Sequence, residues 1–292
     1  MASTIVLKNR IKSIKNTRQI TKAMQLVSAS KMRRAQEHAF ASRPYRDMAY
    51  RLLQHLNETK EVENEPLFKR RPVDARLYVI ITSNSGLAGA YNANVLKLLT
   101  QSLQRDVTDK VTSRVVVIGS KGAQFVRRLP NVDVLGVYTT LGDHPSANDV
   151  RPILNTIMEQ YADASVDEVQ LLYTMFRSNI LQEAQSLQLL PASVADENHD
   201  GKPDGPLLSN FEPNVETVIE QVAIRLVEAQ LWQAVLESLA SEHSMRMISM
   251  KNATDNANDL IADYTLEYNT ARQAGITQEL AEITGGAEAL NG

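Results

Sequence analysis

The stretch NVETVIEQVAIRLVEAQLWQAVLESLASEHSMRMISMKNATDNANDLIADYTLEYNTARQA (214–274) contains neither Gly nor Pro. Because Gly and Pro are the strongest local interrupters of a helix, this stretch can form one continuous helix. Alternate steps of three and four residues from Val215 meet an apolar residue at most positions, which predicts a coiled-coil seam. The later positions of this predicted seam are Met250, Ala253, Ala257, Leu260, Tyr264, Glu267 and Ala271.

The N-terminal segment from Thr4 to Asn57 is the second predicted long helix, since it has no Gly and a single Pro, Pro44. A lone amphipathic helix cannot bury its own apolar stripe. We therefore expect this helix to wind against the C-terminal one. Its predicted seam consists of Leu7, Ile11 and Ile14, followed by Ile20, Ala23, Met24 and Val27.

Charge is divided between the two ends of the chain. The formal net charge is −3, but residues 1–36 carry nine Lys and Arg and no acid. Residues 212–292 carry 13 Asp and Glu against four Lys and Arg. Opposite charges flanking a seam favour pairing, so we expect the basic first helix to face the acidic last helix.

The middle of the chain alternates β-branched runs with helical segments, which predicts a parallel sheet with crossover helices. The predicted strands are 76–83, 114–120, 132–138 and 166–176, and the predicted helices cover about 92–105, 121–129 and 148–162. The predicted fold class is α/β: a long antiparallel coiled coil of the N- and C-terminal helices plus a Rossmann-like α/β domain with a mostly parallel sheet. The predicted segments are an N-terminal helix at 1–60, a sheet domain at 75–192, a connecting loop at 193–211 and a C-terminal helix at 212–292.

Composition narrows the class of protein. With 43% hydrophobic and 22% charged residues the chain is globular rather than disordered. The absence of Cys excludes disulfides, thiolate catalysis and thiolate metal sites. The longest apolar runs are a few residues, whereas a membrane-spanning helix needs about 20.

Two strand-to-helix turns are candidates for binding an anion. TSNSGLAGAYN (82–92) places Gly86 and Gly89 before a helix, and GSKG (119–122) places Lys121 in a similar position. Neither matches a dinucleotide fingerprint or a phosphate-binding loop. Nucleotide binding and a purely structural turn both remain open at this point.

Other chemistry is not indicated. No two of the five His residues have the i, i+3 or i, i+4 spacing of a helical metal pair. The serines of the turns have no obvious base, so we expect no catalytic, cofactor or metal site. The basic N-terminal stretch leaves three alternatives: a protein-interaction scaffold, a nucleic-acid-binding coiled coil, and a transit or lipid-binding segment.

Long strings at both ends resemble the γ subunit of F-type ATP synthases. The first is RIKSIKNTRQITKAMQLVSASKMRRAQ (10–36), and the second is LASEHSMRMISMKNATDNANDLI (239–261) followed by YNTARQAGITQELAEITGGAEA (268–289). The turns TSNSGLAGAYN and VIGSKG resemble the middle of the family. The resemblance covers the whole chain at appropriate spacing.

The resemblance implies a central rotor of the ATP synthase. In that family the paired helices enter a ring of three α and three β subunits, and the sheet domain joins an ε subunit and a membrane c ring. Rotation then couples proton flow to ATP synthesis, and the γ subunit itself carries no catalytic site. The alternative function is a nucleic-acid-binding scaffold, which a steep loss of DNA or RNA affinity with salt would favour.

The resemblance also implies which residues contact the catalytic ring. They are expected on the paired helices, with Met24 and Arg246 exposed along the rod. Regulation by thiols is not expected, since Ala88 stands where many members have Cys. The resemblance favours a bacterial form at the cytoplasmic face of the plasma membrane. The expected subunit-coupling residues are Met24, Lys8, Arg10, Lys31, Arg33, Arg34, Arg246, Gln273, Thr277 and Glu279.

Overall fold

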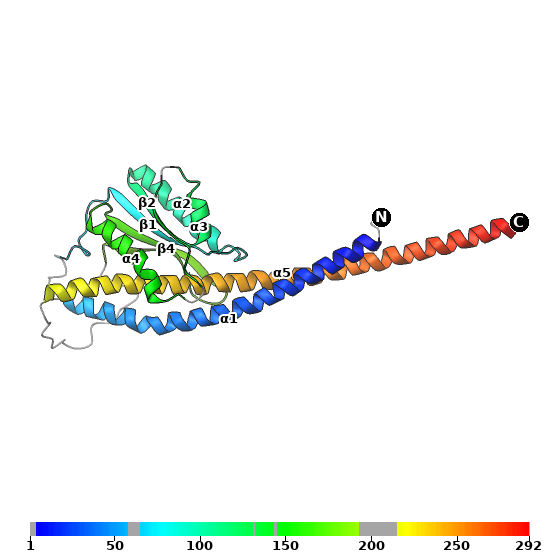
Figure 1. The fold of residues 1–292 in the computed structure, drawn as a ribbon, viewed down its shortest axis with the longest axis horizontal. Coiled ribbons are helices and arrows are strands. Elements are labelled where there is room, and N and C mark those ends of the chain that lie inside the picture. Colours follow the sequence, from blue (N-terminus) through cyan, green and yellow to red (C-terminus); the bar gives the residue numbers. More distant parts are fainter. Residues whose placement is uncertain (1–3, 58–64, 131, 143–144, 193–214, 292) are drawn as a thin grey trace. The chain divides into compact units, whose positions relative to one another are not determined.

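The computed structural model describes residues 4–57, 65–130, 132–142, 145–192 and 215–291. Two long helices, α1 (Thr4–Asn57) and α5 (Val215–Asn291), stand at the two ends of the chain (Figure 1). The chain divides into two compact units, and the division falls inside both helices. Unit 1 consists of Met1–Ser28 and Arg246–Gly292, and unit 2 consists of Ala29–Met245.

The sequence patterns predicted both long helices. Helix α1 continues through Pro44, which removes only one backbone hydrogen bond from a 54-residue helix. Helix α5 continues past the Gly-free stretch through Gly275, Gly285 and Gly286. The predicted connecting loop 193–211 lies outside the described residues.

Unit 2 contains a five-stranded sheet in the order β3-β2-β1-β4-β5. The four predicted strands and three predicted helices are confirmed. Strand β5 was not predicted, because its sequence QEAQSLQLL is rich in Gln and lacks β-branched residues; it pairs antiparallel with β4, whereas the other pairs are parallel. The elements are β1 (Ala75–Ile81), α2 (Tyr91–Asp109), β2 (Thr112–Ile118), α3 (Ser120–Val126), β3 (Asp133–Tyr138), α4 (Ala147–Ala162), β4 (Glu168–Phe176) and β5 (Gln182–Leu190).

Helices cover both faces of this sheet (Figure 1). Successive residues of β1 point to opposite faces, so Val79 packs in one core and Ile80 in the other. Helices α2 and α3 cover the Ile80 face, for example through Leu99. Helix α4 and the first part of α5 cover the Val79 face, for example through Ile157 and Leu231. Part of α5 therefore belongs to the hydrophobic core of unit 2.

In unit 1 the first part of α1 runs antiparallel to the last part of α5. As the residue number rises on α1, the number of its partner on α5 falls. The Arg10 guanidinium lies 5.8 Å from the centroid of the Tyr264 ring. The partner of Arg18 is Asn258. The partner of Thr21 is Thr254.

The predicted seam of α5 is wrong in part after Met250. The predicted positions Leu260 and Glu267 are exposed, and the side chains that turn inward are Thr254, Ile261 and Tyr268. The prediction took a step of three after Met250, whereas the structure takes a step of four to Thr254. Apolar residues occur at both registers, so hydrophobicity alone did not determine which one the helix uses.

The predicted seam of α1 is also wrong in part beyond Ile14, where Met24 is half-buried but the other predicted positions are not. Ile20 and Val27 are 61% and 54% exposed, and Ala23 is exposed as well. The regular steps of three and four from Ile14 lead instead to Arg18, Thr21, Gln25 and Ser28, which are buried or half-buried. The periodicity of a regular helix fixes which residues face its partner, and that face cannot change from one turn to the next. In α1 it turns polar residues inward and leaves these apolar residues exposed.

The charged flanks do not pair as expected either. Among the described residues of unit 1, the structure records no ion pair between a base of α1 and an acid of α5. The interhelical contacts of two bases, Arg10 and Arg18, are to a neutral ring and a neutral amide. Opposite charge does not hold this part of the pair together through direct contacts.

Candidate functional site

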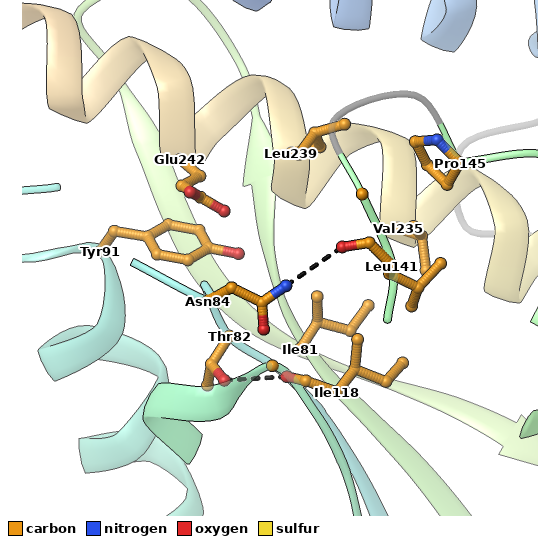
Figure 2. A pocket seen from close by; sticks show the side chains of 12 residues that line it. Ile81, Thr82, Asn84, Tyr91, Ile118, Leu141, Pro145, Val235, Leu239 and Glu242 are labelled. Atoms are coloured by element: carbon orange, nitrogen blue, oxygen red, sulfur yellow. Dashed lines mark hydrogen bonds between the residues drawn. The ribbon is translucent and has the colours of Figure 1, made fainter. Parts of the chain in front are cut away.

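Asn84 joins three loops at the carboxyl edge of the parallel strands (Figure 2). Its side-chain Nδ2 donates to the carbonyl oxygens of Thr139 and Leu141, both at 3.1 Å. Its Oδ1 accepts hydrogen bonds from the backbone N–H and the hydroxyl of Ser120, at 3.0 and 3.1 Å. One amide thus ties the turn after β1 to the turn after β2 and to the loop after β3.

The backbone N–H groups that begin α3 are occupied by the turn after β1. The N–H of Ser120 donates to Asn84 Oδ1, and that of Lys121 donates to the Ser83 carbonyl oxygen at 3.1 Å. The N–H of Gly122 donates to Thr82 Oγ1 at 2.9 Å. An anion would have to displace these bonds. The structural interpretation of the GSKG turn is therefore the one that the geometry supports.

The close fit of the two turns explains Gly119. This residue has φ +97°, a conformation that glycine adopts without strain. A Cβ atom at this position would lie 2.1 Å from the Thr82 carbonyl oxygen. The turn needs glycine so that the two backbones can approach, and not in order to receive a phosphate.

The cavity beside Asn84 is too small for a cofactor. It measures about 40 Å³ and lies between the sheet edge and α5, with Tyr91, Leu141 and Glu242 among its lining residues (Figure 2). A water molecule needs on the order of 10–15 Å³ of such volume, so the cavity has room for about three waters. Pockets for small molecules usually measure about 300–1,000 Å³.

The described residues were compared with the requirements of a metal site and of a membrane-spanning helix. Those residues contain no cluster of three or more metal-binding side chains. Within the same residues, no helix has both the length and the apolarity needed to cross a bilayer.

Three charged side chains of unit 2 form a structural cluster at the amino end of the sheet. Arg76 forms ion pairs with Asp106 and Glu168, and Asp106 is fully buried. The Tyr78 hydroxyl donates to Asp106 at 2.8 Å, and burial together with this bond raises the pKa of Tyr78. Burial disfavours the charge on Arg76, but hydrogen bonds to Glu168 and Tyr78 raise its pKa overall. Paired in this way, these groups hold α2 against the sheet.

The expected subunit-coupling residues are spread over both units. Gln273 and Thr277 lie one turn apart in unit 1, where Thr277 Oγ1 donates to the Gln273 carbonyl oxygen at 3.0 Å. Glu279 is exposed on the same helix. Five further residues of the set lie on α1. In unit 1 these are Lys8 and Arg10, and in unit 2 they are Arg33 and Arg34, with Lys31 half-buried.

Two of the expected subunit-coupling residues are less exposed than predicted. Met24 is half-buried, and Arg246 is only 7% exposed and has an interaction partner in the structure. The expectation that both would be exposed was wrong. Their seam positions explain why, because a helix pair buries the positions that face its partner.

Sequence reasoning missed an exposed apolar surface in unit 1. It includes Ile20, Leu26 and Val27 on α1 and Leu266 and Leu280 on α5. Isolated exposed apolar residues are common, but three of these lie within two turns of α1. The signal was available, since Ile20 lies six residues after Ile14 and so breaks the seam spacing.

Comparisons with known proteins agree on one family. The family model described as ATP synthase matches residues 3–290. The ATP synthase gamma chain of Psychrobacter arcticus is 38% identical over 294 residues, covering 100% of both chains. That of Macrococcus caseolyticus is 40% identical over 293 residues, covering 99% of this chain and 100% of the relative.

Solved structures show the same fold. A chain from the Euglena gracilis mitochondrial ATP synthase (OSCP/F1/c-ring) is 20% identical with a TM-score of 0.67, covering 98% of this chain and 94% of that one. A second chain, from the rotor of the same organism's enzyme, has a TM-score of 0.63 at 20% identity, with 94% and 98% covered. None of these relatives supports the nucleic-acid-binding alternative. The full-length match to gamma chains and the shared fold agree, and the chain belongs to the ATP synthase gamma chain family.

Proposed function

We propose that this chain is the central-stalk rotor subunit of a proton-translocating ATP synthase. It transmits rotation between a membrane c ring and a ring of three α and three β subunits, and it also binds an ε subunit. The observation that carries the proposal is the end-to-end match to gamma chains in a chain whose terminal helices pair antiparallel. Its structural relatives come from a rotor and from an F1/c-ring assembly.

The chain is a subunit of an enzyme complex, and we propose that it is not itself catalytic. The N–H groups of the GSKG turn, which might have bound a phosphate, are occupied by hydrogen bonds within the chain. The complex holds it peripherally at the membrane. The similarity to bacterial gamma chains supports a position on the cytoplasmic side of a bacterial plasma membrane.

The physical mechanism is a coupling between rotor angle and the conformations of the catalytic subunits. A rotor without threefold symmetry contacts three identical subunits differently, so each subunit is biased toward a different nucleotide affinity. Turning the rotor exchanges these biases. Linkage requires the reverse coupling, so ATP hydrolysis in the ring can turn the rotor.

A rotation experiment tests the proposed function. The chain has no Cys, so Arg105→Cys on the exposed side of α2 introduces a single site for a bead. The chain should co-purify with α and β, and ATP should turn the bead when the ring is fixed to a surface. Failure to co-purify, or ATP hydrolysis by the isolated chain, would contradict the proposal.

We further propose that Gln273, Thr277 and Glu279 contact the catalytic ring. All three are exposed, so replacing them together with Ala should change the free energy of unfolding by no more than about 0.5 kcal/mol per site. ATP synthesis driven by a proton gradient should fall by about tenfold, the effect of losing about 1.4 kcal/mol of coupling.

The matched control replaces three other exposed residues of α5, Glu267, Asn269 and Thr270, with Ala. Synthesis by this variant should stay near that of the unchanged chain. An equal loss in both variants would mean that general damage to the helix, and not the three proposed contacts, lowers synthesis.

A further inference from the structure

The parallel ladder between β1 and β4 ends before β4 does. The last paired residues are Ile80 and Leu172, and Thr174 lies two residues further along β4. Thr174 is nevertheless 1% exposed. A buried backbone N–H or carbonyl oxygen without a partner is costly, so the groups of Thr174 need partners from outside the ladder.

Two serines of α5 supply these partners. The Thr174 N–H donates to Ser238 Oγ at 3.1 Å. Ser241 Oγ donates to the Thr174 carbonyl oxygen at 3.2 Å. Both serines are fully buried. The helix thus continues the hydrogen bonding of β4 beyond the point where β1 ends.

The turn between β4 and β5 is bonded to both long helices. Ser244 Oγ of α5 donates to the Asn179 carbonyl oxygen at 2.8 Å, and Gln182 Nε2 donates to the same serine at 3.2 Å. Gln36 Nε2 of α1 donates to Asn179 Oδ1 at 3.0 Å. Asn179 therefore holds α5 through its backbone and α1 through its side chain.

The three serines stand three residues apart, at 238, 241 and 244, so they lie along one side of α5. Their short side chains keep each hydroxyl close to the backbone of α5. Apolar contacts resist separation but tolerate sliding, whereas hydrogen bonds to fixed backbone groups are directional. This row resists rotation of α5 about its own axis as well as separation from the sheet.

We propose that the β4–β5 hairpin is the joint that transmits torque between the two long helices and the sheet of unit 2. The inference rests on the proposed function as a rotor. Ser238, Ser241 and Ser244 act as positioning residues in this joint, and Gln36 connects α1 to it. The joint lies entirely within unit 2.

The test uses the assembled complex with Ser238→Ala, Ser241→Ala and Ser244→Ala combined. With the catalytic ring fixed to a surface, the thermal angular fluctuations of a bead attached through Arg105→Cys report torsional stiffness. We expect the stiffness to fall by about twofold, since most of the bonds between α5 and the hairpin are removed. The unloaded rate of ATP hydrolysis should not change, because the serines bond only to other residues of unit 2 in these contacts and hydrolysis takes place in other subunits.

Hydrogen exchange checks that the intended contact was removed. The Thr174 amide should exchange about tenfold faster in the variant, the effect of losing about 1.4 kcal/mol of protection. Amides of β1 should keep their rates. The control is Ser249→Ala, a half-buried α5 serine outside the hairpin contacts, which should change neither stiffness nor exchange.

The outcomes separate this inference from the proposed function. If the unchanged complex does not rotate, the proposed function fails. If it rotates and the triple variant is as stiff as Ser249→Ala, the inference alone is overturned. Should the triple variant not assemble, Gln36→Ala with Ser244→Ala removes only the contacts at the tip, and unchanged stiffness there also overturns the inference.

Discussion

At the residue scale, Asn84 shows why an amide and not a carboxylate stands at the loop junction. Its Nδ2 donates to two carbonyl oxygens while its Oδ1 accepts from Ser120. In Asn84→Asp both carboxylate oxygens are acceptors, so one would face two carbonyl oxygens without a proton between them. We expect the free energy of unfolding to fall by about 1–3 kcal/mol, measured by urea denaturation at pH 7.

The matched control for this change is Asn94→Asp on α2. Asn94 is exposed, and an acid near the start of a helix is mildly favourable. The control should therefore be neutral or slightly stabilising. A similar loss of stability in both variants would show that added negative charge, and not the lost donor, is responsible.

Tyr78 gives a pH dependence at the same scale. Its pKa is raised in the folded chain by burial and by the bond to Asp106. An unfolded tyrosine ionises near pH 10, so above that pH the unfolded state releases a proton that the folded state keeps. The stabilisation is therefore complete below about pH 10 and is lost as the pH rises further, with a slope of up to about 1.4 kcal/mol per pH unit.

Tyr78→Phe should flatten this part of the pH profile, at the cost of leaving Asp106 one donor short. The measurement is urea denaturation between pH 8 and 11. Tyr138→Phe is the comparison, since it removes the hydroxyl of a half-buried tyrosine that lies 2.8 Å from the Thr156 hydroxyl. An unchanged slope in Tyr78→Phe would show that Tyr78 does not cause the loss of stability above about pH 10.

At the element scale, one polar pair sets the register of the helices in unit 1. The hydroxyls of Thr21 and Thr254 lie 2.8 Å apart, and each also lies near a carbonyl oxygen of its own helix. Each hydroxyl has one hydrogen. If both donated to their own helices, the contact between the two hydroxyls would have no hydrogen, so one hydroxyl donates across the interface. A buried polar contact between two helices favours one alignment over its neighbours.

This register can be tested by disulfide formation because the chain has no other Cys. Thr21→Cys combined with Thr254→Cys should crosslink readily under mild oxidation, detected as a mobility shift on non-reducing gels. Thr21→Cys with Ala257→Cys places the second thiol about 4.5 Å further along α5 and should crosslink far more slowly. Equal rates would mean that the helices slide past one another.

The elements themselves were largely predictable, while the faces they turn inward were not. A stretch without Gly or Pro has few alternatives to a helix, and runs such as RVVVIGS have few alternatives to a buried strand. The seam beyond Ile14 and the strand β5 depend on what lies opposite them. Strand β5 takes its place in the sheet by pairing antiparallel with β4. The composition of β5 does not indicate this partner.

The candidate site could be predicted only in part for the same reason. Similarity to gamma chains located the expected coupling residues, but the burial of Arg246 follows from the helix pairing. The turn around Asn84 was identified as a candidate from its glycines. Its actual role depends on carbonyl oxygens of a loop more than 50 residues away, which no local pattern indicates.

At the scale of the whole molecule, the small net charge of −3 conceals a basic N-terminal end and an acidic C-terminal end. In the described part of unit 1, the bases of α1 form no ion pair with the acids of α5. Their charges therefore remain available to other subunits. Such unpaired charge acts mainly on the rate at which partners associate.

Neutralising Lys8, Lys12 and Lys15 together as Gln should slow assembly with the α and β subunits. If these bases meet acidic segments of the ring, the association rate at low salt should fall by about tenfold. In about 1 M NaCl the Debye length shrinks to about 3 Å, so the difference from the unchanged chain should disappear. Stopped-flow fluorescence over a salt series measures both rates.

The control for this change neutralises Lys97, Arg105 and Lys110, three exposed bases of the α2 region, and so alters the net charge equally. Total charge acts on the approach of any partner, whereas a local patch acts only on the partner surface that it faces. An equal slowing in both variants would therefore assign the effect to total charge. Slowing confined to the first variant places the acidic partner surface along α1.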